Sequence, residues 1–171
     1  MLYKPEFIHL PLYVDNRGIF RRTFCDDLID LPLGMRVVQT NISQNPHKGT
    51  FRGFHFEESL SREWKFMSVV FGKIFIATIC VDKERDDFKK IYTFEIDSEK
   101  GGGILIPPWF ANAFLTLSEN SVIAYSMTLR FEDGQYGVIS RQEAVFEKID
   151  WPCAVNVISV KDDKKTNYFD G

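Results

Sequence analysis

The stretch "KFMSVVFGKIFIATICV", residues 65–81, gives the clearest signal for the class of fold. It places two runs back to back, KFMSVVFG and KIFIATICV, and both are rich in β-branched and aromatic residues. Such runs are typical of short β-strands, and both are too short for a membrane span. The stretch therefore predicts two consecutive β-strands.

Similar runs recur on both sides of this stretch, and turn-forming segments such as DNRG, QNPHKG, DKERDD and EKGGG separate them. The runs lie at residues 7–14, 36–43, 50–58, 89–97, 102–108, 112–118 and 121–131. Many short strands without helical runs between them indicate an all-β antiparallel sandwich or barrel. A helix is expected at one place, FCDDLIDL, residues 24–31.

Composition narrows the class of protein further. The 171 residues suit one domain, 44% of them are apolar, and the net charge of −3 comes without a basic stripe, which argues against a nucleic-acid binder. The three cysteines, Cys25, Cys80 and Cys153, lack CxxC spacing, so neither a disulfide framework nor a zinc site is indicated. With no signal segment recognisable at the start, we expect a cytoplasmic protein.

Common catalytic patterns are not found in the sequence. It has three histidines and no His-x-His pair, which does not favour a metal site. The EKGGG segment is followed by a strand-like run and by no Lys-Ser/Thr, so it is interpreted as a turn rather than a phosphate loop. No Gly-x-Ser-x-Gly elbow occurs either.

The stretch "GTFRGFHFEE", residues 49–58, carries chemistry inside a strand-like run. Regular alternation puts Phe51, Gly53, His55 and Glu57 on one face of the strand and Thr50, Arg52, Phe54 and Phe56 on the other. A regular strand therefore cannot aim both Arg52 and His55 inward. A bulge or kink at Gly53 would allow it.

Two interpretations of His55 follow from the residues alone. It is either a core histidine satisfied by Glu57 or the backbone, or a general base inside a barrel. Lys65, at the start of an apolar strand, supports the second interpretation, because a buried lysine is costly unless a negative group meets it.

Seven motifs, in order along residues 15–162, resemble one family. They are DNRGIF, VQTNIS, GTFRGFHF, WKFMSVVFG, LIPPWFANAF, VIAYSMTLRF and IDWP…ISVKD. The chain resembles the dTDP-4-dehydrorhamnose 3,5-epimerases, which are cupin-fold enzymes of deoxysugar biosynthesis, including that of lipopolysaccharide O-antigen. The resemblance implies a cupin-type jelly-roll sandwich or barrel with a few short helices, and a homodimer.

It also implies a single domain over residues 1–171. Strands in residues 1–48 would contribute to the dimer, residues 49–131 would form the core barrel, and residues 132–171 would add C-terminal strands, loops and a tail.

The resemblance assigns four catalytic residues. His55 matches the general base, Asp162 the carboxylate that orients it, Tyr125 the general acid across the sugar ring, and Lys65 the group facing the enolate oxygen. Without the resemblance, Tyr125 would be interpreted as a core tyrosine and Asp162, in VKDDKK, as part of a solvated charge run.

Substrate contacts are implied in the same way. Arg52 matches a diphosphate or sugar contact, and Arg17 a nucleotide-phosphate ligand that an exchanged N-terminal strand brings across a dimer. Gln39, Asn41 and Lys161 fall within motifs that contact the nucleotide sugar. No metal or redox cofactor is implied, because a 4-keto group already acidifies the C–H bonds at C3 and C5.

Departures from the family pattern concern the residues that read the substrate. Asn112 replaces a histidine, and Phe131 stands where many members have a second tyrosine. Arg22 stands where a glutamate commonly receives the thymine N3–H, and an arginine suits a base such as cytosine, which presents acceptors. Two acidic positions become Ile76 and Cys80.

The leading hypothesis is therefore an epimerase acting on a nucleotide-linked 4-keto-6-deoxy sugar at C3, C5 or both. One alternative is a single-centre epimerase for a CDP-linked or 3,6-dideoxy 4-keto sugar. Others are a 3,4-ketoisomerase and, from a different class, a non-catalytic cupin that binds a nucleotide sugar.

Overall fold

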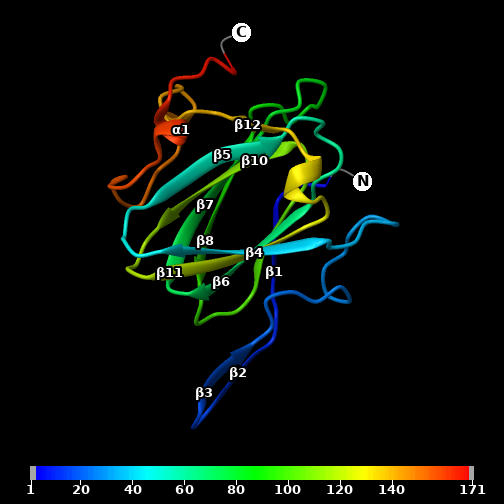
Figure 1. Cartoon of the computed structure of the whole chain (residues 1–171), viewed down its shortest axis with the longest axis vertical. Helices are drawn as coiled ribbons and strands as arrows, with labels where there is room; N and C mark the ends of the chain where they lie inside the picture. Colours follow the sequence, from blue (N-terminus) through cyan, green and yellow to red (C-terminus); the bar gives the residue numbers. More distant parts are fainter. Residues whose placement is uncertain (1–2, 170–171) are drawn as a thin grey trace.

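The computed structural model describes residues 3–169, and its body consists of two five-stranded antiparallel sheets that face each other (Figure 1). The sheet that carries Lys65 has the order β1-β9-β6-β11-β4. In that order the strands are β1 (Glu6–Ile8), β9 (Gly103–Ile106), β6 (Lys65–Phe71), β11 (Ser121–Met127) and β4 (Gln39–Asn45). We call it the β6 sheet.

The opposite sheet carries His55 and is called the β5 sheet. Its order is β12-β5-β10-β7-β8. These strands are β12 (Tyr136–Val138), β5 (Phe51–Glu57), β10 (Phe110–Thr116), β7 (Lys73–Cys80) and β8 (Ile91–Asp97). The stretch of residues 65–81 thus forms β6 and β7, which are consecutive in the chain but belong to different sheets.

The remaining elements are small. A hairpin of β2 (Leu12–Asp15) and β3 (Gly18–Arg21) projects from the sandwich (Figure 1). Three helical turns are η1 (Phe131–Asp133), η2 (Phe146–Lys148) and α1 (Val160–Asp163).

The all-β prediction is confirmed, whereas the expectation of a helix in residues 24–31 is wrong, because that segment forms turns. Its Ile29 packs under the outer face of the β6 sheet with Trp64 and Phe66. Among residues 3–169, no helix has the length and apolar character needed to cross a membrane.

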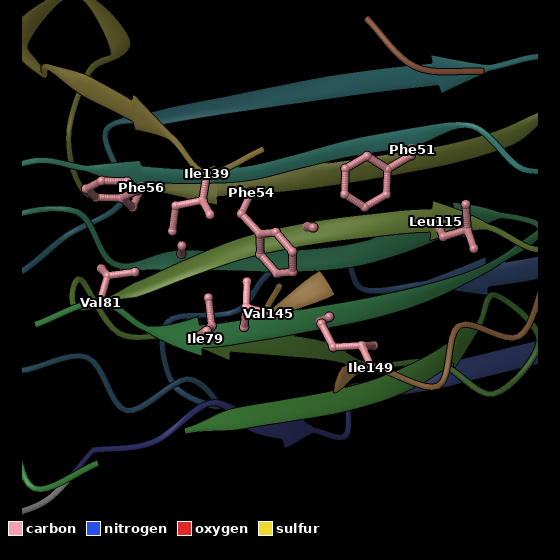
Figure 2. Packing of buried hydrophobic residues seen from close by; sticks show 12 residues of the cluster. Phe51, Phe54, Phe56, Ile79, Val81, Leu115, Ile139, Val145 and Ile149 are labelled. Carbon is pink, nitrogen blue, oxygen red and sulfur yellow. The ribbon is translucent and has the colours of Figure 1, made fainter. Parts of the chain in front are cut away.

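Three central strands of the β5 sheet are covered on both faces. Along β7, Ile74, Ile76 and Cys80 point between the sheets, whereas Ala77 and Ile79 point outward. Residues of the C-terminal segment, among them Val145 and Ile149, cover the outer face (Figure 2). Burial on both faces explains why this part of the sequence is continuously apolar rather than alternating.

Strand β5 departs from regular alternation at Gly53. His55 lies opposite Asn112, but Arg52 lies opposite Phe114, so β5 contains one more residue than β10 over this interval. Gly53 has φ +132°, and an added Cβ would lie 2.5 Å from the Cα of Ala113. The position therefore requires glycine.

The extra residue determines where the neighbouring side chains point. Phe51, Phe54 and Phe56 all join the outer core (Figure 2). Arg52 and His55 both line the space between the sheets. Regular alternation placed Phe51 and Phe54 on opposite faces of β5, and that expectation is wrong. The bulge considered at Gly53 is confirmed.

Candidate active site

A cavity of about 610 Å³ lies between the two sheets. The β5 sheet, β6, β11 and β4 contribute its walls, and the α1 segment contributes one side. Its lining residues are Gln39, Asn41, Ser43, Arg52, His55, Lys65, Met67, Asn112, Phe114, Tyr125, Met127, Phe131, Glu132, Tyr136, Ser159, Lys161 and Asp162. All four predicted catalytic residues are among them.

His55 is paired with a buried carboxylate. Its Nε2 lies 2.7 Å from Oδ1 of Asp162, while the His55 side chain is 36% exposed and that of Asp162 5%. The second Asp162 oxygen accepts from the Gly53 N–H at 3.4 Å. The predicted alternative partner, Glu57, instead pairs with Arg62 at 3.0 Å.

The hydrogen bonds keep Asp162 ionised. Burial by itself raises the pKa of this carboxyl group, but hydrogen bonds from His55, Gly53 and Ser159 outweigh it and hold the pKa below its usual range. Ser159 caps α1, and its hydroxyl accepts from the Asp162 N–H at 3.1 Å. This cap fixes the direction in which the carboxylate leaves the short helix.

Lys65 has two partners: Glu63, just before its own strand, and Asn112, on β10 of the facing sheet. Its Nζ lies 2.8 Å from Oε1 of Glu63 and 3.3 Å from Oδ1 of Asn112. The Lys65 side chain is 11% exposed and that of Glu63 4%. The negative partner that the sequence required for Lys65 is therefore Glu63. Ile76, at a position that is acidic in the family pattern, is fully buried in the apolar core.

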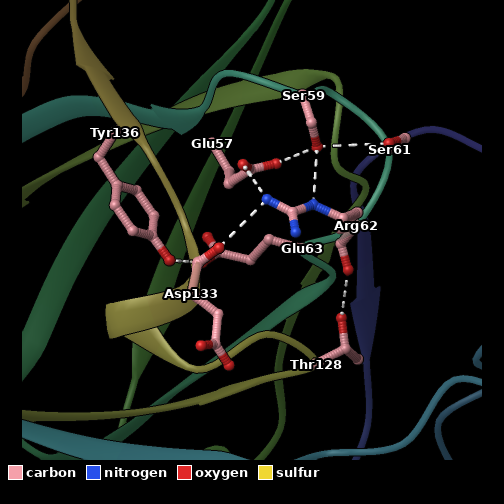
Figure 3. Close-up of polar contacts among 8 residues, drawn as sticks. All are labelled: Glu57, Ser59, Ser61, Arg62, Glu63, Thr128, Asp133 and Tyr136. Atoms are coloured by element: carbon pink, nitrogen blue, oxygen red, sulfur yellow. Dashed lines mark hydrogen bonds and ion pairs between the residues drawn. The ribbon is translucent and has the colours of Figure 1, made fainter.

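Two tyrosines reach the cavity in different states. Tyr125 projects from β11 into the cavity, and its hydroxyl makes no hydrogen bond to any other residue within the described range, 3–169. The Tyr136 hydroxyl donates to Glu63 (Figure 3). Burial raises the pKa of Tyr125, Arg52 opposes this, and Glu63 adds to it. Tyr125 is thus a protonated phenol at neutral pH.

The other predicted contacts divide into two groups. Arg52, Gln39, Asn41, Asn112, Phe131 and Lys161 all line the cavity. Asn45 accepts from Arg52 Nε at 2.9 Å, and the Phe131 ring stacks on Tyr136 at a centroid distance of 4.8 Å.

Arg17 and Arg22 lie outside the cavity lining of this chain. Arg17 is exposed on the projecting hairpin, where it pairs with Asp15. Arg22 is exposed just after β3. Neighbouring Arg21, by contrast, donates to the backbone oxygen of Ser98 at 2.6 Å.

Sequence reasoning missed Glu63, Glu132 and Tyr136. A signal for Glu63 was present, because residues i and i+2 of an extended segment share a face and Glu63 precedes Lys65 by two. Tyr136 offered no comparable signal, since its place depends on the pairing of β12 with β5.

The fold and this cavity define a jelly-roll sandwich in which His55, paired with Asp162 of α1, faces a lysine and a tyrosine from the other sheet. A model of the dTDP-4-dehydrorhamnose 3,5-epimerase family matches residues 6–170. The chain belongs to this family of enzymes.

Individual relatives agree. A dTDP-4-dehydrorhamnose 3,5-epimerase of Salmonella typhimurium is 27% identical over 144 residues, or 82% of this chain and 77% of that protein. A Legionella pneumophila dTDP-6-deoxy-D-glucose-3,5-epimerase, solved with dTDP-4-keto-L-rhamnose, is 26% identical with a TM-score of 0.79, covering 92% of this chain and 89% of that one.

A Streptomyces bikiniensis 3′-monoepimerase, solved with dTDP-quinovose, shares the fold. Its TM-score is 0.76 at 18% identity, and the match covers 92% of this chain and 79% of that chain.

Proposed function

We propose that this chain epimerises a nucleotide-diphosphate 4-keto-6-deoxy sugar at C3, C5 or both, through an enolate. The observation that carries the proposal is the placement of a base and an acid on facing sheets. His55, with Asp162 behind it, projects from the β5 sheet, and Tyr125 projects from the β6 sheet into the same cavity. Inversion of a carbon requires proton removal on one face and proton delivery on the other.

His55 serves as the base. With Nε2 bonded to Asp162, the tautomer that donates this proton keeps the lone pair of Nδ1 for a C–H bond of the sugar. Asp162 holds that tautomer and stabilises the imidazolium that forms, as an aspartate does in a hydrolytic triad. A neutral imidazole suits removal of a proton next to a ketone near neutral pH.

Lys65 and Tyr125 complete the reaction. Removal of the proton delocalises negative charge onto the C4 keto oxygen, and the Lys65 ammonium stabilises it there. A fixed donor of this kind is worth about 10²- to 10³-fold in rate. Tyr125 then delivers its proton to the opposite face of the carbon, which inverts the centre.

The nucleotide diphosphate is bound by cationic side chains. Arg52 and Lys161, which line the cavity, bind the phosphates, and Gln39 and Asn41 add polar contacts. Arg17 reaches a neighbouring site in a homodimer with an exchanged N-terminal strand, and Arg22 contacts the base, dTDP- or CDP-linked. The exposed hairpin with Tyr13 and Phe20 supports an interface there.

A single-centre epimerase is the second candidate. Asn112 cannot carry a proton at neutral pH, and Phe131 removes a hydroxyl from the cavity. Both changes leave fewer groups to manage a second centre. The non-catalytic alternative is disfavoured, because a binding protein has no need of a base and an acid on opposite walls.

Proton NMR in D₂O tests the proposal with dTDP- and CDP-linked 4-keto-6-deoxy sugars. Deuterium entering C3 and C5 identifies a double epimerase, and deuterium at one carbon identifies a single-centre enzyme. A sugar that binds without any exchange would leave the non-catalytic cupin as the function.

A further inference from the structure

A chain of three polar side chains, Lys65, Glu63 and Tyr136, lies along one side of the cavity. Glu63 is at its centre: Oε1 lies 2.8 Å from Lys65 Nζ, and Oε2 accepts from the Tyr136 hydroxyl (Figure 3). Both outer members line the cavity, whereas Glu63 itself lies behind them. Glu63 thus lies where it can act through its neighbours.

Burying this carboxylate is costly unless its charge is compensated. The Glu63 side chain is 4% exposed, and removing one partner of a buried ion pair is strongly destabilising because it leaves an uncompensated charge. Its two donors supply that compensation, one to each oxygen. The same contacts give Lys65 a counter-charge in a place where water is largely excluded.

The ammonium geometry shows what this pairing leaves free. An ammonium group has three N–H donors at tetrahedral angles. Glu63 takes one and Asn112, at 3.3 Å, takes another. One donor of Lys65 therefore remains for a ligand in the cavity, and its direction is set by the two that are occupied.

We propose that Glu63 is a positioning residue for epimerisation: it holds Lys65 so that the free N–H meets the C4 oxygen of the sugar. The proposal rests on the proposed function. Glu63 touches no reacting atom, and its effect on the rate passes through Lys65.

The hydrogen bond to Glu63 gives Tyr136 a different role from that of Tyr125. Its proton is committed to Glu63, and burial together with this carboxylate raises the pKa of the phenol. Tyr136 therefore stabilises Glu63 and, stacked on Phe131, forms cavity wall. Tyr125 is left as the phenol that transfers a proton.

Glu63→Gln tests the proposal, because glutamine keeps the size of the side chain and removes its charge and one acceptor. We expect kcat for deuterium exchange to fall about 10- to 100-fold, the range found for supporting carboxylates around metal sites, while KM changes little. Circular dichroism and thermal melting confirm that the variant is folded. Unchanged kcat in the folded variant would overturn the proposal.

A double-mutant cycle separates positioning from a merely structural role. In a Lys65→Gln background the free ammonium donor is already lost, so adding Glu63→Gln should cost less than about 3-fold in kcat. Glutamine at position 65 can still donate to Glu63, which protects the fold. Equal losses in both backgrounds would show that Glu63 acts independently of Lys65, and the proposal would fail.

Glu143→Gln provides the matched control. Glu143 is also buried, and its carboxylate accepts from the backbone N–H groups of Tyr168 and Phe169, outside the cavity. It should lower the melting temperature without lowering kcat. A kcat loss equal to that of Glu63→Gln would show a general effect of neutralising buried acids and would contradict the proposal. Absence of exchange by the wild-type protein would instead refute the proposed function.

Discussion

The cavity contains two pairs of a buried carboxylate and a basic residue, His55 or Lys65, and the pairs differ in how the basic residue is held. In the Asp162–His55 pair the base is 36% exposed, one ring nitrogen is fixed and the other is left to the cavity. In the Glu63–Lys65 pair the base is 11% exposed and two of its donors are occupied. A group that must exchange a proton needs a free nitrogen, whereas a group that supplies constant charge is best enclosed by its partners.

The largest effect should come from a change in the Asp162–His55 pair. His55→Asn removes the base but leaves a polar side chain, and we expect the exchange rate to fall about 10⁴-fold, the upper range for general base catalysis. Nucleotide affinity, measured by calorimetry with the nucleoside diphosphate, should stay nearly unchanged. Exchange at the wild-type rate would mean that another residue is the base.

Asp162→Asn should have the next largest effect. The amide can hold the imidazole in place, but it favours the wrong tautomer and cannot stabilise the imidazolium, so we expect a loss of up to about 10⁴-fold in kcat. The same assay of exchange in D₂O measures it. A loss below that of Glu63→Gln would reverse the ranking of the two pairs.

Gly53→Ala should disturb the backbone next to the Asp162–His55 pair. The new methyl group would lie 2.5 Å from the Ala113 Cα at a φ of +132°, so we expect a loss of about 2 kcal/mol or more in the free energy of unfolding. Urea unfolding measures this loss. Gly34→Ala is the control, because its added Cβ has nothing within 4 Å and its φ of +86° is also unfavourable. Equal losses would mean that the close approach to Ala113 is unimportant.

The smallest effect should be on stability in acid. Asp162 has a pKa below its ordinary value of 3.8, so its contribution to stability is complete above that value and is lost as the pH falls through it towards the lower folded pKa. The stability difference between wild type and Asp162→Asn, measured by urea unfolding, should therefore shrink below about pH 4. A difference that grows in acid would mean that the folded pKa is raised.

Asp97 offers a control for that measurement. It is paired with Lys73 at 2.7 Å outside the cavity, and although burial alone raises its pKa, Lys73 and the Glu99 N–H hold it low. Asp97→Asn should likewise make the free energy of unfolding less dependent on pH in acid, while the exchange rate stays at the wild-type level.

Much of the fold and site could be predicted from the sequence. Turn residues between short β-rich runs indicated a sandwich, and the ordered motifs placed His55, Asp162, Tyr125 and Lys65 in one family pattern. The helix expected at residues 24–31 failed because the apolar side chains there, such as Ile29, pack on the sheet from a turn. The alternative in which Glu57 satisfies His55 is wrong, because Arg62 and Ser59 occupy that carboxylate.

Most strands, the apolar character of the doubly covered sheet and the possible bulge at Gly53 followed from the sequence. Which side chains meet in the cavity depends on the folded arrangement of distant segments. Asp162 reaches His55 across 107 residues of chain, and Tyr136 reaches Glu63 across 73. Local periodicity carries no information about such pairs, because it fixes the face on which a side chain lies and not the strand or loop that will be packed opposite.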